Sequence, residues 1–343
     1  MEKIKKIQIG ENIYSLTDND LSELLSLTEN KGKILKVGDN NDLTVFVLEN
    51  DKYEAEVNGT KYETLRAAVE ATETGTIKLL KEIVLDAQLK ITDGKTLTID
   101  FNGHSIRADK KLALNSLLIG VEFGGSLTFE GIGGVYAGTN TYGAIGTCMS
   151  VGGSGKTSQL IVNGGYYEGY YYAISSEGTK TENLSNIQIN GGTFKALNCL
   201  DSIAFYNPAY NGTVTITDGE FIGATACEIR AGNATISGGH FVGVAPFTIV
   251  ANSGGSASTG CALAVIQHSS KQSISVNVTG GLFEGAYSFY EANPLKNSQT
   301  DIDKVKITLT GGAFKNPIYS EDKTKFIGAK CLVPTDTNET YKA

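Results

Sequence analysis

The stretch IQINGGTF (Ile187–Phe194) decides the fold class, because it recurs as VTITDGEF at Val214–Phe221 and as ATISGGHF at Ala234–Phe241. Ahead of each glycine, apolar and polar residues alternate, which is the period-two pattern of a strand with one buried face. Glycine then permits the positive φ of a sharp bend, and an aromatic residue follows two places later. The stretch therefore predicts a strand, a bend and an inward-facing ring.

The same unit repeats through the centre of the chain. The predicted rings are Tyr136, Tyr167, Phe194, Phe221, Phe241, Phe283 and Phe314. Ile106, in LTIDFNGHSI, occupies the aromatic place one unit before Tyr136. The long interval between Phe241 and Phe283 is interpreted as two coils of equal length, one of which has lost its signature.

Repeats of this kind stack as parallel coils, and neighbouring strands lie about 4.8 Å apart, so equivalent aromatic residues should form a column of stacked rings. The residue between glycine and aromatic has no shared property and is predicted to face solvent; these residues are Val135, Tyr166, Thr193, Glu220, His240, Leu282 and Ala313. A second inward strand is predicted from Ala173, Cys227, Phe247 and Phe289, with Cys199 one place short. The sequence thus predicts an all-β parallel β-helix over residues 97–317.

The open end of a coil stack exposes unpaired backbone groups unless a segment covers it. The stretch GTKYETLRAAVEATETGTIKLL (59–80) predicts a short helix and then a strand. The apolar stripe of that helix is Leu65, Ala68, Val69 and Ala71, and the strand begins with Thr76, Ile77 and Leu79. With LTIDFNGHSI after it, this stretch resembles the N-terminal cap of the pectate-lyase-like, right-handed β-helix proteins. The resemblance implies a right-handed solenoid with a helical cap at residues 58–96, and it specifies fold rather than activity. Residues 318–343 are assigned as a C-terminal cap or tail.

Residues 1–57 form a separate, small α+β module in this interpretation. IKKIQIG and ENIYSL predict a hairpin, residues 18–29 a short helix, and KILKVG and LTVFVLEN two strands. So small a module has a marginal core and should need a partner. The sequence IKKIQIGENIYSL, with KILKVGDNNDLTVFV after it, is similar to attachment regions of fibre and decoration proteins from tailed phages of the gut, including the crAss-like group. That resemblance implies attachment of residues 1–57 to capsid or tail proteins and a homo-oligomer, a trimer.

Composition and charge argue against several other classes. The formal charge is −8, and no Lys/Arg cluster exists outside the short Lys3–Lys6 run, so no nucleic acid partner is expected. No apolar run reaches the length of a signal-peptide core or a membrane span, which predicts cytoplasmic synthesis without membrane insertion. Five cysteines without C-x-x-C spacing predict reduced thiols rather than disulfides or a zinc site, and no cofactor or metal is expected.

These features together predict a phage virion structural protein, a head or tail fibre or a decoration protein, assembled in the host cytoplasm. Its N-terminus would anchor it, and the β-helix would contact host-surface glycan. A bacterial surface adhesin is an alternative that the missing export signal disfavours. A decoration protein without any host ligand is another alternative.

A polysaccharide-degrading enzyme, either a glycoside hydrolase or a lyase, is the alternative with a different chemistry. Glycoside hydrolysis needs two carboxylates roughly 5 to 9 Å apart. Asp201 and Glu228 both lie seven residues after their aromatic residue, so they are predicted to be outward neighbours in one column, with Glu291 as a looser third member. The competing interpretation is an exposed acidic pair without a catalytic role, and no catalytic residue is assigned.

Tyrosines are the candidate ligand-binding residues, because exposed tyrosine rings stack on sugars. The candidates are Tyr166, Tyr170, Tyr171, Tyr206 and Tyr210. Packing against a neighbouring subunit, or within a turn, is the alternative role for these residues. Two glycine-rich runs are predicted to be structural: GGSGKTS (152–158) as a surface turn, and SGGSASTG (253–260) as a flexible loop leaving the solenoid.

Overall fold

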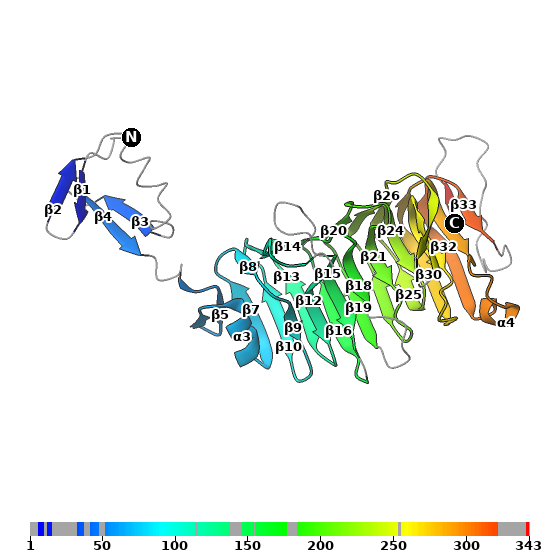
Figure 1. The fold of residues 1–343 in the computed structure, drawn as a ribbon, viewed down its shortest axis with the longest axis horizontal. Coiled ribbons are helices and arrows are strands. Elements are labelled where there is room, and N and C mark those ends of the chain that lie inside the picture. The colour runs from blue at the N-terminus through cyan, green and yellow to red at the C-terminus, as the bar shows by residue number, and fades with distance from the viewer. Residues whose placement is uncertain are drawn as a thin grey trace.

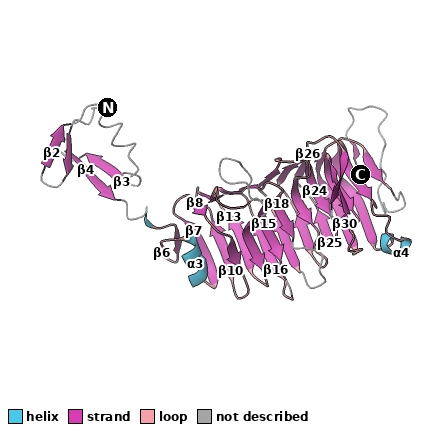
Figure 2. Ribbon diagram, viewed as in Figure 1, coloured by secondary structure: helices cyan, strands magenta, loops and turns pink. Residues whose placement is uncertain are grey.

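A computed structural model of the chain describes residues 52–113, 116–137, 146–153, 155–176, 184–249 and 258–321 in full. It describes the backbone alone of residues 6–9, 12–15, 33–37, 42–47, 250–252, 255–257 and 341–342. Most of these residues form β-strands, and the helices are short (Figure 2).

Two sheets of mostly parallel strands, one of 19 strands and one of nine, make up the body of the protein (Figure 1). They are called the large sheet and the small sheet below. Each repeat of the chain adds a first and a second strand to the large sheet and a third strand to the small sheet.

The first strands are β7 (Thr74–Leu79), β10 (Thr96–Asp100), β13 (Ser126–Glu130), β16 (Ser158–Val162), β19 (Ser185–Ile189), β22 (Thr213–Ile216) and β25 (Gly232–Ile236). The second strands are β8 (Ile83–Leu85), β11 (Ser105–Ala108), β14 (Gly134–Tyr136), β17 (Tyr166–Glu168), β20 (Thr193–Ala196), β23 (Glu220–Gly223) and β26 (His240–Gly243). In the last repeats, β30 (Ile274–Glu284) and β32 (Val305–Phe314) each combine a first and a second strand. The third strands are β9 (Leu89–Ile91), β12 (Leu117–Glu122), β15 (Thr147–Gly152), β18 (Tyr172–Ser176), β21 (Ile203–Asn207), β24 (Thr225–Ile229), β29 (Cys261–Ile266), β31 (Tyr287–Ala292) and β33 (Ile318–Ser320).

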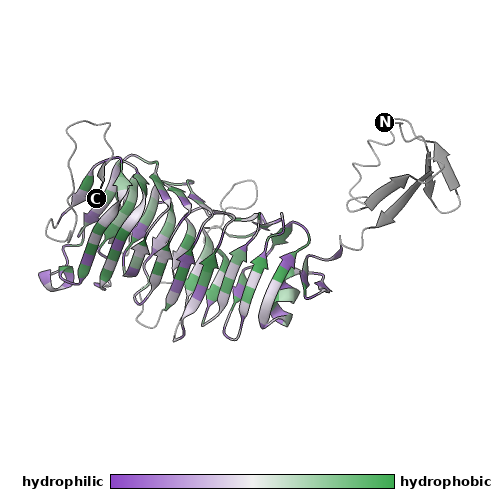
Figure 3. Cartoon of the chain, turned by 180° about the vertical axis from the view of Figure 1, so that it is seen from behind, coloured by the Kyte–Doolittle hydropathy of each residue, from purple (hydrophilic) through white to green (hydrophobic). Residues whose placement is uncertain are grey.

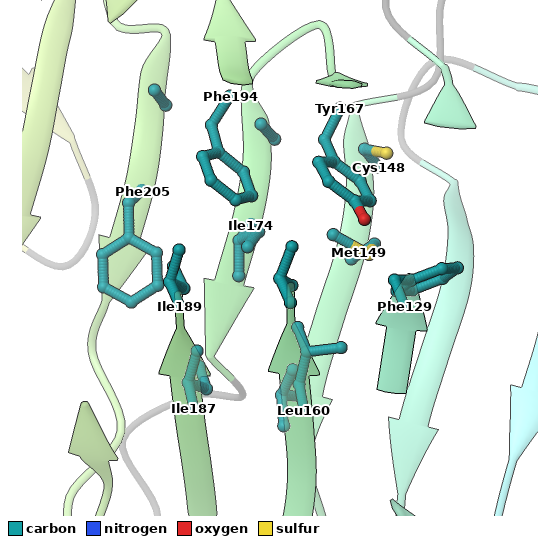
Figure 4. Packing of buried hydrophobic residues seen from close by; sticks show 14 of the residues in the cluster. Phe129, Cys148, Met149, Leu160, Tyr167, Ile174, Ile187, Ile189, Phe194 and Phe205 are labelled. Carbon is teal, nitrogen blue, oxygen red and sulfur yellow. The ribbon is translucent and has the colours of Figure 1, made fainter. Parts of the chain in front are cut away.

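A column of stacked rings lies in the core between the two sheets, as the repeats predict. Figure 4 shows two of its members, Tyr167 and Phe194. The rings of Phe194, Phe221 and Phe241 stack in succession, with centroid distances of 4.8 and 4.6 Å and interplanar angles of 13° and 3°. Tyr167, Phe283 and Phe314 continue the column at 4.8 to 5.1 Å between neighbours, and all six side chains are fully buried. Polar and apolar residues alternate along the strands around this core (Figure 3).

The predicted ring at Tyr136 is wrong by one residue. The register pairs Tyr167 with Val135, and Val135 in turn with Ile106, so Val135 is the fully buried member and Tyr136 faces outward. The cause is the bend, where Gly133 rather than Gly134 has positive φ. Ile106 does occupy the place predicted for it, and the rings of Phe129 and Phe101 extend the aromatic core from neighbouring positions.

The interval between Phe241 and Phe283 is one repeat and not two. The two residues pair directly in register, and their rings stack at 4.9 Å. The extra length is an antiparallel hairpin, β27 (Thr248–Asn252) and β28 (Gly255–Thr259), inserted between β26 and β29. The stretch SGGSASTG is therefore largely a strand of this hairpin and does not form the predicted loop.

The third strands supply the other side of the core, as predicted at Cys227 and Phe289. These two side chains share one register column with Ile174, Phe205 and Leu263, and all five are fully buried. Phe247 was expected in the same column, but it lies before β27 and packs on the rings of Tyr287 and Tyr290. Ala173 is buried one place before the column, and Cys199 lies in the turn before β21.

The predicted helix is α3 (Leu65–Ala71), and its buried residues are Leu65, Ala68 and Val69, whereas Ala71 is exposed. The Thr64 hydroxyl accepts a hydrogen bond from the backbone N–H of Ala67, which caps the helix N-terminus. The helix contacts β7 and the hairpin of β5 (Ala55–Val57) and β6 (Thr60–Tyr62). The parallel ladder already begins at β7, which pairs with β10.

A separate four-stranded sheet precedes this body. It comprises β1 (Lys6–Ile9), β2 (Asn12–Ser15), β3 (Lys33–Val37) and β4 (Asp42–Val47) in the order β2-β1-β4-β3. The predicted hairpin is confirmed as the antiparallel pair β1 and β2, and the two predicted strands as β3 and β4. The predicted helix at residues 18–29 lies outside the described residues. At the other end of the chain, α4 (Gln299–Ile302) precedes β32. β34 (Tyr341–Lys342) pairs antiparallel with β32.

Candidate functional site

A cluster of tyrosines lies at the small sheet, around the start of β18 and on β21. Its members are Tyr170, Tyr171, Tyr172 and Tyr206, and all four are half-buried. Tyr170 and Tyr171 meet edge to face at 5.0 Å and 80°, and Tyr171 lies 6.4 Å from Tyr172. Three of the tyrosines are adjacent in the sequence and the fourth belongs to the next repeat, so the parallel pairing of β18 with β21 brings them together.

Tyr172 and Tyr206 form the stacked pair of this tyrosine cluster. Their rings stack at 4.9 Å and 17°, which occupies one face of each ring. Burial raises the pKa of both phenols, so both are neutral hydrogen-bonding groups at physiological pH. Arg230 donates a hydrogen bond to Tyr206. The charge of Arg230 and this hydrogen bond lower the pKa of Tyr206, but burial raises it by more.

Asp201 lies beside the more exposed part of the cluster. Burial raises the pKa of both Tyr171 and Tyr172, and the charge of Asp201 adds a smaller increase, after that of Cys199 at Tyr171 and after those of Tyr206 and Glu228 at Tyr172. The Asp201 carboxylate also accepts a hydrogen bond from the Cys199 thiol at 2.9 Å. Burial and this contact raise the pKa of Cys199 to about 11, so the thiol stays protonated. The site therefore combines aromatic rings with an acceptor carboxylate.

A fully buried charge pair lies next to the cluster, where Glu228 on β24 pairs in register with Tyr206 on β21. Glu228 and Arg230 are 0% and 1% exposed, and Arg230 Nε lies 3.6 Å from Glu228 Oε1. Burial raises the pKa of Glu228 to about 7, against the opposing effects of Arg230 and of the backbone N–H of Ser258. Desolvation therefore outweighs the ion pair, and Glu228 is partly protonated at neutral pH.

The inserted hairpin covers this charge pair. Thr225 Oγ1 donates a hydrogen bond to the Ser258 carbonyl at 2.6 Å, and Gly260 N–H donates to the Ala224 carbonyl at 2.8 Å. Glu228 shares a register column with Ala264 and Tyr290, which belong to a second apolar cluster apart from the ring core. Glu228 thus lies on the outer side of the small sheet, under β28.

His268 lies near the same arginine. Burial, and then the charge of Arg230, lower the pKa of His268 to about 4, so its imidazole is neutral at physiological pH. Its Nδ1 accepts a hydrogen bond from the backbone N–H of Ser270.

Family models, curated proteins and solved structures were compared with this chain, and none matches it.

Asp201 and Glu228 are not neighbours in one column, contrary to the sequence-based expectation. The register pairs Glu228 with Tyr206, and Asp201 lies in the turn before that strand. Glu291 pairs with Val265 in the adjacent column, where it is buried and accepts a hydrogen bond from Ser320. The error arose because the two turns differ in length, so equal distances from the aromatic residue do not mean equal positions.

The other candidate tyrosines lie elsewhere. Tyr166 is on the outer side of the large sheet, where its ring stacks on Tyr136 at 5.1 Å and its hydroxyl donates to Glu168 at 2.8 Å. The guanidinium of Arg107 lies 4.4 Å from the Tyr136 ring centroid. Tyr210 is half-buried in the turn between β21 and β22. Sequence reasoning did not select Tyr172 as a binding residue. It selected Glu228 but did not predict that this carboxyl is fully buried beside Arg230.

The remaining sequence candidates have structural roles. Residues 155–157 lie between β15 and β16, and Lys156 is paired with Asp93. His240 contacts Glu284 at 2.8 Å on the large sheet. Over the described ranges, no group of three or more His, Cys, Asp and Glu side chains is placed to hold a metal ion. The helices in those ranges include none that is both long and apolar enough to cross a membrane.

Proposed function

We propose that the two sheets form a right-handed parallel β-helix, with α3 as its N-terminal cap, and that the protein is a phage fibre or decoration protein. In this proposal residues 1–57 attach it to the capsid or tail, and the β-helix binds a host-surface glycan through the tyrosine cluster. The separate four-stranded sheet at the N-terminus and the regular coil stacking after it support this division of labour.

The observation that carries the glycan proposal is the placement of Tyr171 beside Asp201. Aromatic rings offer apolar faces to the C–H groups of a sugar, and a carboxylate accepts hydrogen bonds from its hydroxyls. The Tyr171 ring also packs on Tyr172, whose ring stacks on Tyr206, and contacts of this kind reduce the side-chain entropy that binding would cost.

A glycan array of bacterial surface polysaccharides tests the proposal with the full chain. Tyr171→Ala should weaken binding roughly tenfold, which is the loss of about 1.4 kcal/mol. Tyr319→Ala is the matched control, because Tyr319 is 42% exposed and stacks on Tyr290 away from the cluster. Binding that survives Tyr171→Ala would refute this site, and silence across the array would favour decoration without a host ligand. A mass measurement of the same sample tests the trimer.

Polysaccharide cleavage is the second candidate, and a specific observation favours it. A carboxyl group with a pKa of about 7 is suited to act as a general acid. However, Glu228 is 0% exposed beneath the hairpin, and a general acid must reach the glycosidic oxygen. Cleavage would therefore require the hairpin to move, and it would be abolished by Glu228→Gln.

A further inference from the structure

The first strands of the large sheet present an outer face that is almost free of charge. Two register columns run along it. The first column is Thr74, Thr96, Ser126, Gln159, Asn186, Thr213, Asn233, Ser275 and Lys306. The second column is Thr76, Thr98, Thr128, Ile161, Gln188, Thr215, Thr235, Asn277 and Thr308. Every member is Thr, Ser, Asn or Gln except Ile161 and Lys306. This surface is called the amide–hydroxyl face below.

The composition of the amide–hydroxyl face differs from that of the neighbouring second strands. There, one outward register column includes Arg107, Glu168, Lys195 and Glu284. Charges also occur beside the first coils, where Lys78, Asp100 and Glu130 share a column. The uncharged area is therefore widest over β19, β22 and β25, where the residues next in line are Asn190, Thr217 and Ser237.

The side chains of the amide–hydroxyl face exclude several classes of partner. A nucleic acid or an acidic polymer needs cationic side chains, and only Lys306 lies in the two columns. A stable protein interface has an apolar, aromatic-rich core, and the two columns contain only Ile161 as a large apolar side chain. A partner that fits is therefore neutral and rich in hydroxyl groups.

The spacing of side chains on the amide–hydroxyl face indicates the shape of the partner. Equivalent side chains in successive coils recur about every 4.8 Å, and the two columns stand side by side because residues i and i+2 of a strand share a face. Some members bond to each other, such as Thr213 Oγ1 to Asn186 Oδ1 at 3.0 Å and Ser126 Oγ to Gln159 Oε1 at 3.3 Å. Among the described residues, no side-chain hydrogen bond joins Thr215 or Thr235 to a neighbour, and both are exposed. Their hydroxyls are accessible to a ligand.

We propose that the amide–hydroxyl face binds a neutral, extended polysaccharide that runs across the coils, with one sugar unit facing each coil or nearly so. In an extended polysaccharide every sugar ring carries hydroxyl groups, and the length of one sugar unit along the polymer is close to the spacing between coils. Threonine hydroxyls and side-chain amides would donate to and accept from those hydroxyls. This site is distinct from the tyrosine cluster, which lies on the small sheet.

A pull-down of the full chain with insoluble polysaccharides tests the proposal. The probes are a β-1,4-glucan, a β-1,3-glucan, a β-1,4-xylan and a β-1,4-mannan, each at low salt and at about 0.5 M NaCl. The chain should bind at least one of them with an affinity that salt does not reduce. The double variant Thr215→Val with Thr235→Val should bind roughly tenfold more weakly, because it removes two hydroxyls and keeps shape and strand propensity.

Thr193→Val is the matched control, since Thr193 is half-buried on a second strand and should leave binding unchanged. Three results would overturn the proposal. Binding to none of the four polymers excludes the ligand class. Binding that Tyr171→Ala removes and the double variant keeps assigns the polymer to the tyrosine cluster. A lower molecular mass for Thr215→Arg with Thr235→Arg than for the wild type shows that the face joins copies of this chain.

Discussion

Replacing Glu228 with Gln should make the protein more stable near pH 8 and leave its stability unchanged near pH 4. Burial raises the pKa of this carboxyl from 4.5 to about 7. Each pKa unit corresponds to about 1.4 kcal/mol, so the ionised carboxylate costs the folded state roughly 3 kcal/mol above pH 7. Glutamine has nearly the shape of the protonated acid and never ionises.

The direction follows from proton linkage. The folded-state pKa of Glu228 lies above the unfolded value, so the folded protein binds this proton more tightly. The stability that Glu228 contributes is complete below pH 4.5 and is lost as the pH rises through about 7. The attraction of Arg230 at 3.6 Å already opposes this shift and does not cancel it.

Urea unfolding followed by circular dichroism, at several pH values between about 4 and 8, measures the effect as the difference between the two proteins. Glu70→Gln is the matched control for the same change of residue, because Glu70 is exposed on α3. If Glu228→Gln is less stable than the wild type near pH 8, the buried ion pair is net stabilising and the reasoning is wrong. Parallel curves for the two proteins would also refute it.

Three further outcomes are expected. Phe221→Ala should lower the free energy of unfolding in urea by roughly 3 to 5 kcal/mol, because the ring is fully buried between two others. Phe123→Ala is the control and should lower it by about 0.5 kcal/mol, because Phe123 is 47% exposed. Equal losses for the two variants would mean that the ring column is not a core. Gly219→Ala should cost roughly 1 to 3 kcal/mol, since its φ is +125° and a Cβ would lie 3.2 Å from the Gly192 carbonyl oxygen. Gly59→Ala, at φ +82° with nothing within 4 Å, should cost about 1 kcal/mol, and a larger loss there would contradict the contact argument. Iodoacetamide should leave the buried thiols of Cys148, Cys227 and Cys261 unmodified in the native protein, because burial also raises the pKa of each; mass spectrometry of peptides would reveal any that react.

The sequence alone determined the strands and the ring column. Alternation such as Ile187-Gln188-Ile189 is a local property, and it specifies which side chains are buried wherever the strand is placed. The glycine before each ring is also a local signal, because positive φ excludes most other residues. For these reasons the local pattern is sufficient to place Phe194, Phe221 and Phe241 inward.

Only the tertiary structure decided how one coil aligns with the next. Tyr136 and Val135 are equally good candidates for the core until the bend at Gly133 sets the register. A hairpin inserted in one coil has the same length in sequence as an additional coil, and pairing of Phe241 with Phe283 distinguishes them. The meeting of Glu228 with Tyr206, and its burial under that hairpin, depends on the lengths of turns in different coils. Turn lengths vary at little energetic cost. Alternation within a strand excludes a register shift of one residue against the neighbouring strand, but it does not distinguish shifts of two residues, so the turns decide the alignment.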